Sequence, residues 1–176
     1  MRDQGEMKEH SMTRKEAAGS PEPLTVSKAI SAARIKLNLK ATDRDGILRE
    51  LVPLVIDPRD ERGTEVLFKA LKEREDLCST CVNDGVAVPH SRNALVGLVD
   101  HPVLAYGRHR RGAAFGSLNG KPVHHFFLLC APNVREHLQL LARLARLINK
   151  PEFRDGLMAA ESPDQLMALI QRMEQL

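Results

Sequence analysis

Hydrophobic residues show no period at the start of the chain and become regularly spaced only from Leu24 onward. Residues 1–23 are polar and include the turn-rich segment GSPEP, so we predict a flexible N-terminal extension. Residues 24–176 then alternate between strand-like and helix-like patterns, and their number fits a single domain.

A short strand and two amphipathic helices are predicted in the first part of this domain. In ARIKLNL, every second residue from Ile35 to Leu39 is apolar, which is typical of a half-buried strand. The first helix has Thr42 as its candidate N-cap and ends at Asp57-Pro58, and the second covers ERGTEVLFKALKERED. The apolar positions at helical spacing are Ile47, Leu48, Leu51, Leu54 and Val55 in the first helix, and Val66, Leu67, Ala70 and Leu71 in the second.

Strand-like patterns dominate the middle of the chain. The segments GVAVPH, PVLAYGR and HHFFLLCAP, at residues 85–90, 102–108 and 124–132, are predicted to be strands. Asn119-Gly120 precedes the third of them and is a strong turn signal.

Helices return at Asn133, which forms a capping box with Glu136 three residues later. This helix is expected to end before Pro151, and two shorter helices follow at about residues 151–160 and 163–175. Its predicted apolar stripe consists of Val134, Leu138, Leu141, Leu144 and Ile148. The order strand, two helices, several strands and helices again predicts an α/β fold with helices on both faces of the sheet.

Composition narrows the class of protein. The chain is 43% hydrophobic with no Trp and one Tyr, which predicts an aliphatic core. The net charge is only +3 and both signs are interspersed, which argues against a nucleic-acid partner. Only GRHRRG at residues 107–112 is locally basic, and we interpret it as a solvated turn or strand edge, with an acidic partner surface as the alternative.

The apolar runs are too short for a membrane-spanning helix, and the start of the chain lacks the apolar stretch of a signal peptide. Three cysteines are a sparse and odd number, which suits a reducing compartment better than a disulfide framework. We therefore expect a cytoplasmic protein without direct membrane insertion.

Two of the seven histidines have a distinctive setting. His90 follows Pro89 at the end of a predicted strand, where α/β proteins place working groups, although an ordinary strand-end histidine is the alternative. His137 lies in the first helical turn behind Asn133, where the helix dipole favours an anion and a neutral imidazole. The others are expected to be structural or, for His10, part of the extension; they are His10, His101, His109, His124 and His125.

The segment before His90 carries further polar candidates. Taken singly, Arg74 is a solvated charge at a helix end, and Ser79 and Thr80 are turn or cap hydroxyls. Cys78 and Cys81 form a C-x-x-C, for which two free thiols, a redox pair and half of a zinc site all remain open.

Taken together, REDLCSTCVNDGVAVPHSR and FFLLCAPNVREHLQLLARLA closely resemble the IIA domain of the fructose–mannitol class in the bacterial phosphoenolpyruvate-dependent sugar phosphotransferase system. That class includes the stand-alone nitrogen-regulatory IIA proteins. The resemblance extends from about Leu24 to Leu176, and it implies three α/β/α layers around a mixed β-sheet.

The resemblance also implies roles for individual residues. His90 matches the phosphorylated nucleophile of the family, His137 matches the histidine beside the phosphoryl group, and Arg74 matches the arginine that assists electrostatically. It implies a phosphohistidine carrier, a phosphotransferase component that needs neither a metal nor a cofactor.

Four more residues are candidates for binding the phosphoryl group. Ser79 and Thr80 match the family's "ST", and Ser91 and Arg92 are near His90 in sequence. Arg92 is equally placed to face a docking partner.

The loop before His90 departs from the family pattern. Cys78, Cys81 and Asn83 stand at positions that are usually rich in glycine, and cysteine tolerates a left-handed backbone poorly. Asp84 adds a carboxylate near a site meant for an anion. These differences put the shape of the phosphate-binding loop in question.

The resemblance implies a histidine phosphocarrier protein as the donor, and a IIB protein or a regulatory target as the acceptor or reader. Because the sequence contains neither a IIB segment nor a membrane portion, we expect the nitrogen-regulatory type. The alternatives are a IIA component that serves fructose- or mannitol-type sugar uptake, a binding module that is not phosphorylated, and a C-x-x-C metal or redox protein.

Overall fold

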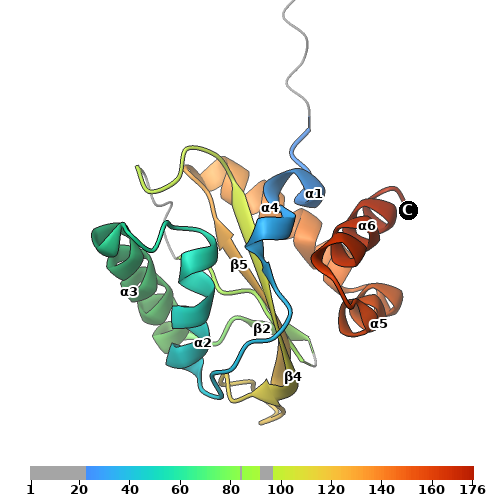
Figure 1. Ribbon diagram of the computed structural model, residues 1–176, viewed down its shortest axis with the longest axis horizontal. Coiled ribbons are helices and arrows are strands. Elements are labelled where there is room, and N and C mark those ends of the chain that lie inside the picture. The colour runs from blue at the N-terminus through green and yellow to red at the C-terminus, as the bar shows by residue number, and fades with distance from the viewer. Residues whose placement is uncertain (1–22, 84, 92–96) are drawn as a thin grey trace, which may run out of the picture.

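The computed structural model describes residues 23–83, 85–91 and 97–176. A mixed sheet lies at its centre (Figure 1). The sheet has five strands in the order β1-β4-β5-β3-β2. In this sheet β1 is parallel to β4 and β3 is parallel to β5, whereas the β4–β5 and β2–β3 pairs are antiparallel. The strands are β1 (Ile35–Lys36), β2 (Cys81–Asn83), β3 (Val86–Ala87), β4 (Val103–Ala113) and β5 (Val123–Cys130). The predicted N-terminal extension lies outside the described residues, except for Pro23.

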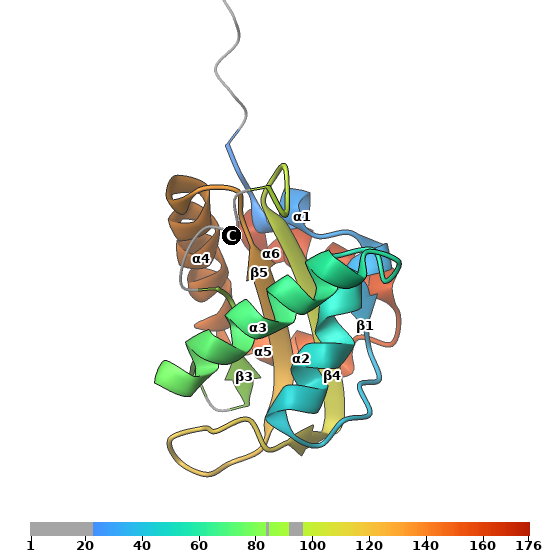
Figure 2. The same ribbon diagram turned by 90° about the vertical axis from the view of Figure 1, so that its left-hand side faces the viewer.

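Helices cover both faces of the sheet, which confirms the predicted α/β/α layers. The α2 and α3 helices cross one face, and the C-terminal helices lie on the other (Figures 1 and 2). The helical elements are α1 (Val26–Ala29), η1 (Ala32–Arg34), α2 (Arg44–Leu51), η2 (Val52–Leu54), α3 (Glu61–Leu77), α4 (Val134–Ile148), α5 (Pro151–Ala159) and α6 (Pro163–Glu174). Within the described ranges, no helix is both long and apolar enough to cross a bilayer.

Two hydrophobic cores result, one on each side of the sheet; both are mainly aliphatic, and together they hold all five Phe side chains. Successive side chains of a strand point to opposite faces, so Phe126 packs in the core under α2 and α3 while Phe127 packs in the core under α4 to α6. This explains why β5 is continuously apolar from Phe126 to Cys130 instead of alternating: both of its faces are buried there.

The first strand is shorter than predicted, and the N-cap of the first helix was wrongly predicted. After β1 the Leu39 N–H still donates to the Arg108 carbonyl (2.8 Å), and the N–H groups of Lys40 (2.8 Å) and Ala41 (2.6 Å) then donate to the Glu50 carboxylate. Asp43, instead of Thr42, caps α2 by accepting from the Gly46 N–H (3.0 Å). The Thr42 carbonyl instead accepts from the Ala114 N–H (2.9 Å).

Some apolar positions assigned to the core are exposed. The exposed fraction is 47% for Val66, 61% for Val134 and 57% for Leu138. The helices are rotated about their axes relative to the predicted stripes, because other residues provide the faces that pack on the sheet. These are Leu67, Phe68 and Leu71 in α3, and Leu140, Leu144, Leu147 and Ile148 in α4.

The basic segment GRHRRG is only partly the solvated edge that we predicted. It lies within β4, where Arg108 and His109 are buried and Arg110 and Arg111 are exposed. The Arg108 guanidinium donates to three carbonyl groups at the end of α5, where the helix dipole favours a cation. These carbonyls belong to Leu157 (3.1 Å), Met158 (2.8 Å) and Ala160 (2.7 Å).

Candidate functional site

Two parallel strands bring His90 and His137 to the same edge of the sheet. His90 follows β3 and forms an isolated bridge with Leu129 of β5, where the Leu129 N–H donates to the Pro89 carbonyl at 2.9 Å. The chain leaves β5 at Cys130 and enters α4, whose first turns carry His137. The centroids of the two imidazole rings are 5.3 Å apart, and the rings are tilted by 55°. The structure thus brings these two predicted residues together.

The hydrogen bond of His90 indicates which ring nitrogen carries the proton. Nδ1 lies 2.7 Å from the Val88 carbonyl oxygen, and a carbonyl oxygen can only accept a hydrogen bond. Nδ1 therefore carries the proton, and Nε2 has an available lone pair. Burial lowers the pKa of His90 below its ordinary 6.5, the Val88 contact opposes this, and the charge of Arg74 lowers the pKa further. The ring is neutral at pH 7 and nucleophilic at Nε2.

His137 lies just inside a well-capped helix. The Asn133 side chain accepts from the Glu136 N–H at 3.0 Å and donates to the Glu136 carboxylate at 2.6 Å, which confirms the predicted cap. Burial, and then the charge on His90, lower the pKa of His137. Two neutral rings beside the positive end of a helix dipole form a setting that favours an incoming anion.

Arg74 lies in the last turn of α3, and one hydrogen bond to the residue after the helix orients its side chain. Its Nη1 donates to the Cys78 carbonyl at 2.7 Å, which holds the guanidinium over the loop that leads to β2. Its positive charge acts on His90, because it contributes to the lowered pKa of that ring. A part for Arg74 in assisting phosphoryl transfer stays a prediction.

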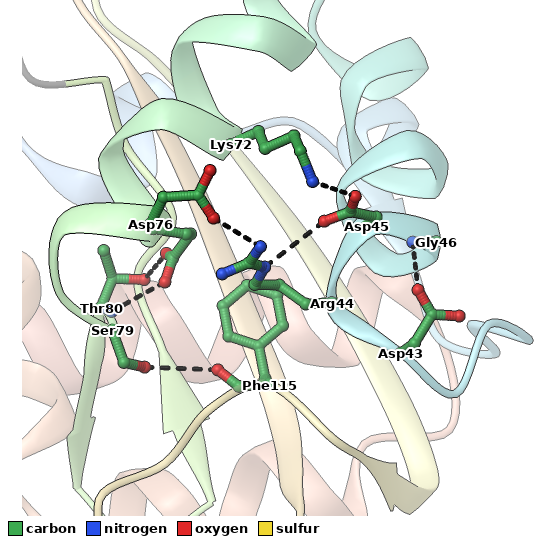
Figure 3. A network of polar contacts seen from close by, with 10 residues as sticks. Asp43, Arg44, Asp45, Gly46, Lys72, Asp76, Ser79, Thr80 and Phe115 are labelled. Atoms are coloured by element: carbon green, nitrogen blue, oxygen red, sulfur yellow. Dashed lines mark hydrogen bonds and ion pairs between the residues drawn. The ribbon is translucent and has the colours of Figure 1, made fainter.

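Ion pairs between α2 and α3 stabilise the end of α3 that carries Arg74 (Figure 3). Arg44 donates to Asp76 at 2.6 Å, and Lys72 forms an ion pair with Asp45. These pairs are half-exposed, so each contributes modestly to stability and mainly sets the relative position of the helices.

Ser79 and Thr80 are engaged by the protein itself (Figure 3). The Ser79 hydroxyl donates to the Phe115 carbonyl at 3.3 Å and accepts from the Cys81 N–H at 3.3 Å. Thr80 is buried, and both its N–H (3.0 Å) and its hydroxyl donate to the Glu75 carboxylate. Their part in binding a phosphoryl group stays a prediction, as does that of the buried Ser91.

The sequence interpretation overlooked Glu75, a carboxylate that is only 4% exposed. A signal was present, because Glu75 continues the buried stripe of α3 at a spacing of four residues from Leu71. An acidic residue on the apolar face of a helix calls for a specific partner, and Thr80 is that partner.

The loop before β3 avoids the strain that the cysteines suggested. Cys78 has φ −169°, an extended conformation, and among the described residues only glycines have positive φ, including Gly85 at 81°. The cysteines therefore impose no left-handed backbone, whereas the question of whether the loop binds a phosphoryl group stays open to test. Asp84 and Arg92, which sequence placed near the site, lie outside the described residues.

Cys78 and Cys81 are both free thiols, the first exposed and the second half-buried. Burial raises the pKa of Cys81 above its ordinary value. No group of three or more His, Cys, Asp or Glu side chains with metal-binding geometry occurs in residues 23–83, 85–91 and 97–176. The C-x-x-C therefore finds no further metal ligands within these ranges.

The sequence matches a known protein family and is similar to several known proteins. A family model described as "Phosphoenolpyruvate-dependent sugar phosphotransferase system, EIIA 2" matches residues 28–173. The fructose-specific EIIABC component of Bacillus subtilis is 31% identical over 150 residues, which cover 84% of this chain and 23% of that longer protein. A nitrogen regulatory protein of Pseudomonas aeruginosa is 28% identical over 149 residues, which cover 84% of this chain and 95% of that one.

Solved structures agree with the fold. The nitrogen regulatory protein IIA-Ntr of Neisseria meningitidis has a TM-score of 0.73 at 28% identity, with 82% of this chain and 98% of that chain covered. A complex of enzyme IIA-mannitol with phosphorylated enzyme IIB-mannitol from Escherichia coli has a TM-score of 0.67 at 20% identity, covering 81% and 96% of the two chains. At that identity the second likeness concerns the fold alone.

Proposed function

The chain belongs to the EIIA 2 family of the phosphoenolpyruvate-dependent sugar phosphotransferase system, and on this premise we propose that it carries a phosphoryl group on His90. The observation that supports this most strongly is the hydrogen bond from His90 Nδ1 to the Val88 carbonyl at 2.7 Å. It leaves Nε2 as the only nucleophilic nitrogen of a ring that is neutral at pH 7.

The transfer step follows from that tautomer. The lone pair on His90 Nε2 attacks the phosphorus of a phosphohistidine on a donor phosphocarrier protein, and a new N–P bond forms. The donor's N–P bond breaks, and its electron pair returns to the donor imidazole. The transferring group resembles metaphosphate, so positioning and charge stabilisation contribute most of the rate enhancement.

The residues around His90 supply that stabilisation. As the bond forms, the His90 ring becomes positive, and the Val88 carbonyl stabilises the proton on Nδ1. His137 lies across the site and donates from a ring nitrogen to the phosphoryl oxygens, and Arg74 offsets their charge. Each of these groups belongs to the protein, and the step as written uses no metal or cofactor.

The output that we propose is regulatory: partners read whether His90 is phosphorylated. The match to the Pseudomonas nitrogen regulatory protein, which covers 95% of that protein, supports this reading. A phosphoryl group adds about two negative charges, which is sufficient to alter a docking surface. Exposed Val134 and Leu138 flank His137 and give such a surface an apolar part. Such a relay draws on phosphoenolpyruvate, so the protein would work in the cytoplasm.

Transfer to a IIB protein for sugar uptake is the second candidate function. The specific observation in its favour is the 31% identity to the fructose-specific component of Bacillus subtilis. The solved IIA–IIB complex of the mannitol system shares this fold. Incubating the phosphorylated protein with a purified fructose-type IIB separates the two functions, because only the uptake function predicts rapid loss of the phosphoryl group to IIB.

The carrier function itself is tested by reconstitution. The protein is incubated with phosphoenolpyruvate, enzyme I and a histidine phosphocarrier protein, and its intact mass is measured. We expect an acid-labile gain of one phosphoryl group, and none in His90→Ala. A wild-type protein that gains no mass would contradict the carrier function and leave the unphosphorylated binding module and the C-x-x-C redox protein as alternatives.

A further inference from the structure

Among the described residues, Thr80 provides both hydrogen bonds to the buried carboxylate of Glu75. Oε2 accepts from the Thr80 N–H at 3.0 Å, and Oε1 accepts from the Thr80 hydroxyl. Glu75 is in the last turn of α3 and Thr80 directly precedes β2, so this contact ties the helix to the edge of the sheet. A buried carboxylate is costly unless it is well hydrogen-bonded, which suggests that it has a specific purpose here.

The contact replaces one bond of the β2–β3 ladder. Cys81 pairs with Ala87 in antiparallel register, so Thr80 pairs with Val88. In a hydrogen-bonded antiparallel pair the two residues exchange both N–H···O bonds. The Val88 N–H does donate to the Thr80 carbonyl, at 3.0 Å, but the Thr80 N–H donates to Glu75 instead of returning the bond.

The Val88 carbonyl, which receives no hydrogen bond from Thr80, has another donor. Without the ladder bond from Thr80, its oxygen accepts from His90 Nδ1 at 2.7 Å. One continuous series of hydrogen bonds therefore runs from Glu75 through Thr80 and Val88 to His90.

We propose that Glu75 is a positioning residue for phosphoryl transfer: by holding the Thr80 N–H, it leaves the Val88 carbonyl to His90 Nδ1 and so keeps the lone pair on Nε2. The catalytic consequence rests on the proposed function of His90, whereas the effect on the tautomer is a property of the protein alone. When Glu75 is absent, the Thr80 N–H completes the ladder, and the imidazole is able to carry its proton on Nε2.

The test is the tautomer of His90, read from long-range proton–nitrogen NMR spectra of its ring at a pH above the titration of both histidines. We expect the proton on Nδ1 in the wild type, and a shift toward Nε2 in Glu75→Leu. Glu75→Gln keeps an oxygen for the Thr80 N–H and is expected to keep the wild-type tautomer. Glu73→Leu, which changes an exposed acidic residue of the same helix, is the matched control and is expected to change nothing at His90. A folded Glu75→Leu protein with the wild-type tautomer would overturn the proposal.

A second measurement needs no variant. Scalar couplings across hydrogen bonds in the wild type are expected between the Val88 nitrogen and the Thr80 carbonyl carbon, and to be absent between the Thr80 nitrogen and the Val88 carbonyl carbon. Finding the second coupling would show a complete ladder pair and overturn the proposal even if Glu75→Leu does not fold.

The kinetic consequence is measured separately. Phosphoryl uptake by Glu75→Leu is expected to slow by about tenfold or more at an unchanged half-saturating donor concentration, because the loss lies in the transfer step. If neither wild type nor variant takes up a phosphoryl group, the carrier function fails, while the tautomer and coupling results still decide the role of Glu75.

Discussion

His90 and His137 face each other with ring centroids 5.3 Å apart, although 47 positions separate them in the chain. A charge on His90 lowers the pKa of His137, so the pair disfavours two charged rings. With Nε2 of His90 as the nucleophile, the His137 ring is in position to contact the phosphoryl group that His90 binds. This pairing is the basis of the first prediction.

Replacing His137 by Ala should slow phosphoryl uptake by about a hundredfold without abolishing it, because one preformed donor to the phosphoryl oxygens is lost while the nucleophile remains. Rapid-quench measurement of uptake checks this. His101→Ala, which removes an exposed histidine, is the control and should behave as wild type. Uptake by His137→Ala at the wild-type rate would remove His137 from the mechanism.

His125 should make the protein less stable in acid. Burial, followed by the charges of His124 and Arg108, lowers the pKa of this ring from 6.5 to about 4, while its Nδ1 is hydrogen-bonded to the Tyr106 hydroxyl at 2.8 Å. In the unfolded chain it binds a proton at about 6.5, so between these values the unfolded state holds more protons and stability falls as pH falls.

The expected loss from His125 between pH 6.5 and pH 4 is about 3 kcal/mol, since each pKa unit corresponds to about 1.4 kcal/mol. Urea unfolding at both pH values, for wild type and His125→Gln, measures it. The variant keeps hydrogen-bonding capacity for Tyr106 but does not titrate there, so it should lose correspondingly less stability. Equal losses in the two proteins would disprove this assignment.

Arg108→Met should destabilise the protein by about 3 kcal/mol, because three carbonyl groups at the end of α5 lose their buried donor. Arg111→Met, three residues along the same strand, changes an exposed side chain and should stay within about 0.5 kcal/mol of wild type. Denaturant titration compares the two variants. Similar free energies of unfolding for the two variants would mean that the Arg108 guanidinium contributes little to stability.

The fold was largely predictable because its signals are local. Five consecutive apolar residues from Phe126 to Cys130 predict a strand that is buried on both faces, and Asn133 with Glu136 predicts the start of α4. The β2 strand was missed, because three residues, Cys81–Asn83, with a register shift against β3 carry no period.

Residue patterns alone predict less of the candidate site than of the fold. Nothing local in the sequence shows that His137 approaches His90, and only the family resemblance linked them. The hydrogen bond from the Thr80 N–H to Glu75 in place of Val88 could not be predicted either, because it depends on the end of α3 lying next to the edge of the sheet.

The three thiols should react at very different rates. Cys78 is exposed, whereas Cys130 is buried in β5 and burial raises its pKa to about 12. A thiol reagent should therefore modify Cys78 first and leave Cys130 unmodified until the protein unfolds. Peptide mapping after brief alkylation checks the order. Under the free-thiol reading, Cys78→Ser with Cys81→Ser should retain phosphoryl uptake; a severe loss would favour the redox alternative.

The position of the phosphoryl group on the ring tests the central claim most directly. Protein labelled with nitrogen-15 in its histidines is phosphorylated through the donor relay, and the one-bond coupling between phosphorus and nitrogen is recorded by NMR. We predict that the coupled nitrogen is Nε2 of His90, with the proton retained on Nδ1 beside the Val88 carbonyl. Coupling to Nδ1 of His90, or to a nitrogen of any other histidine, would contradict the account.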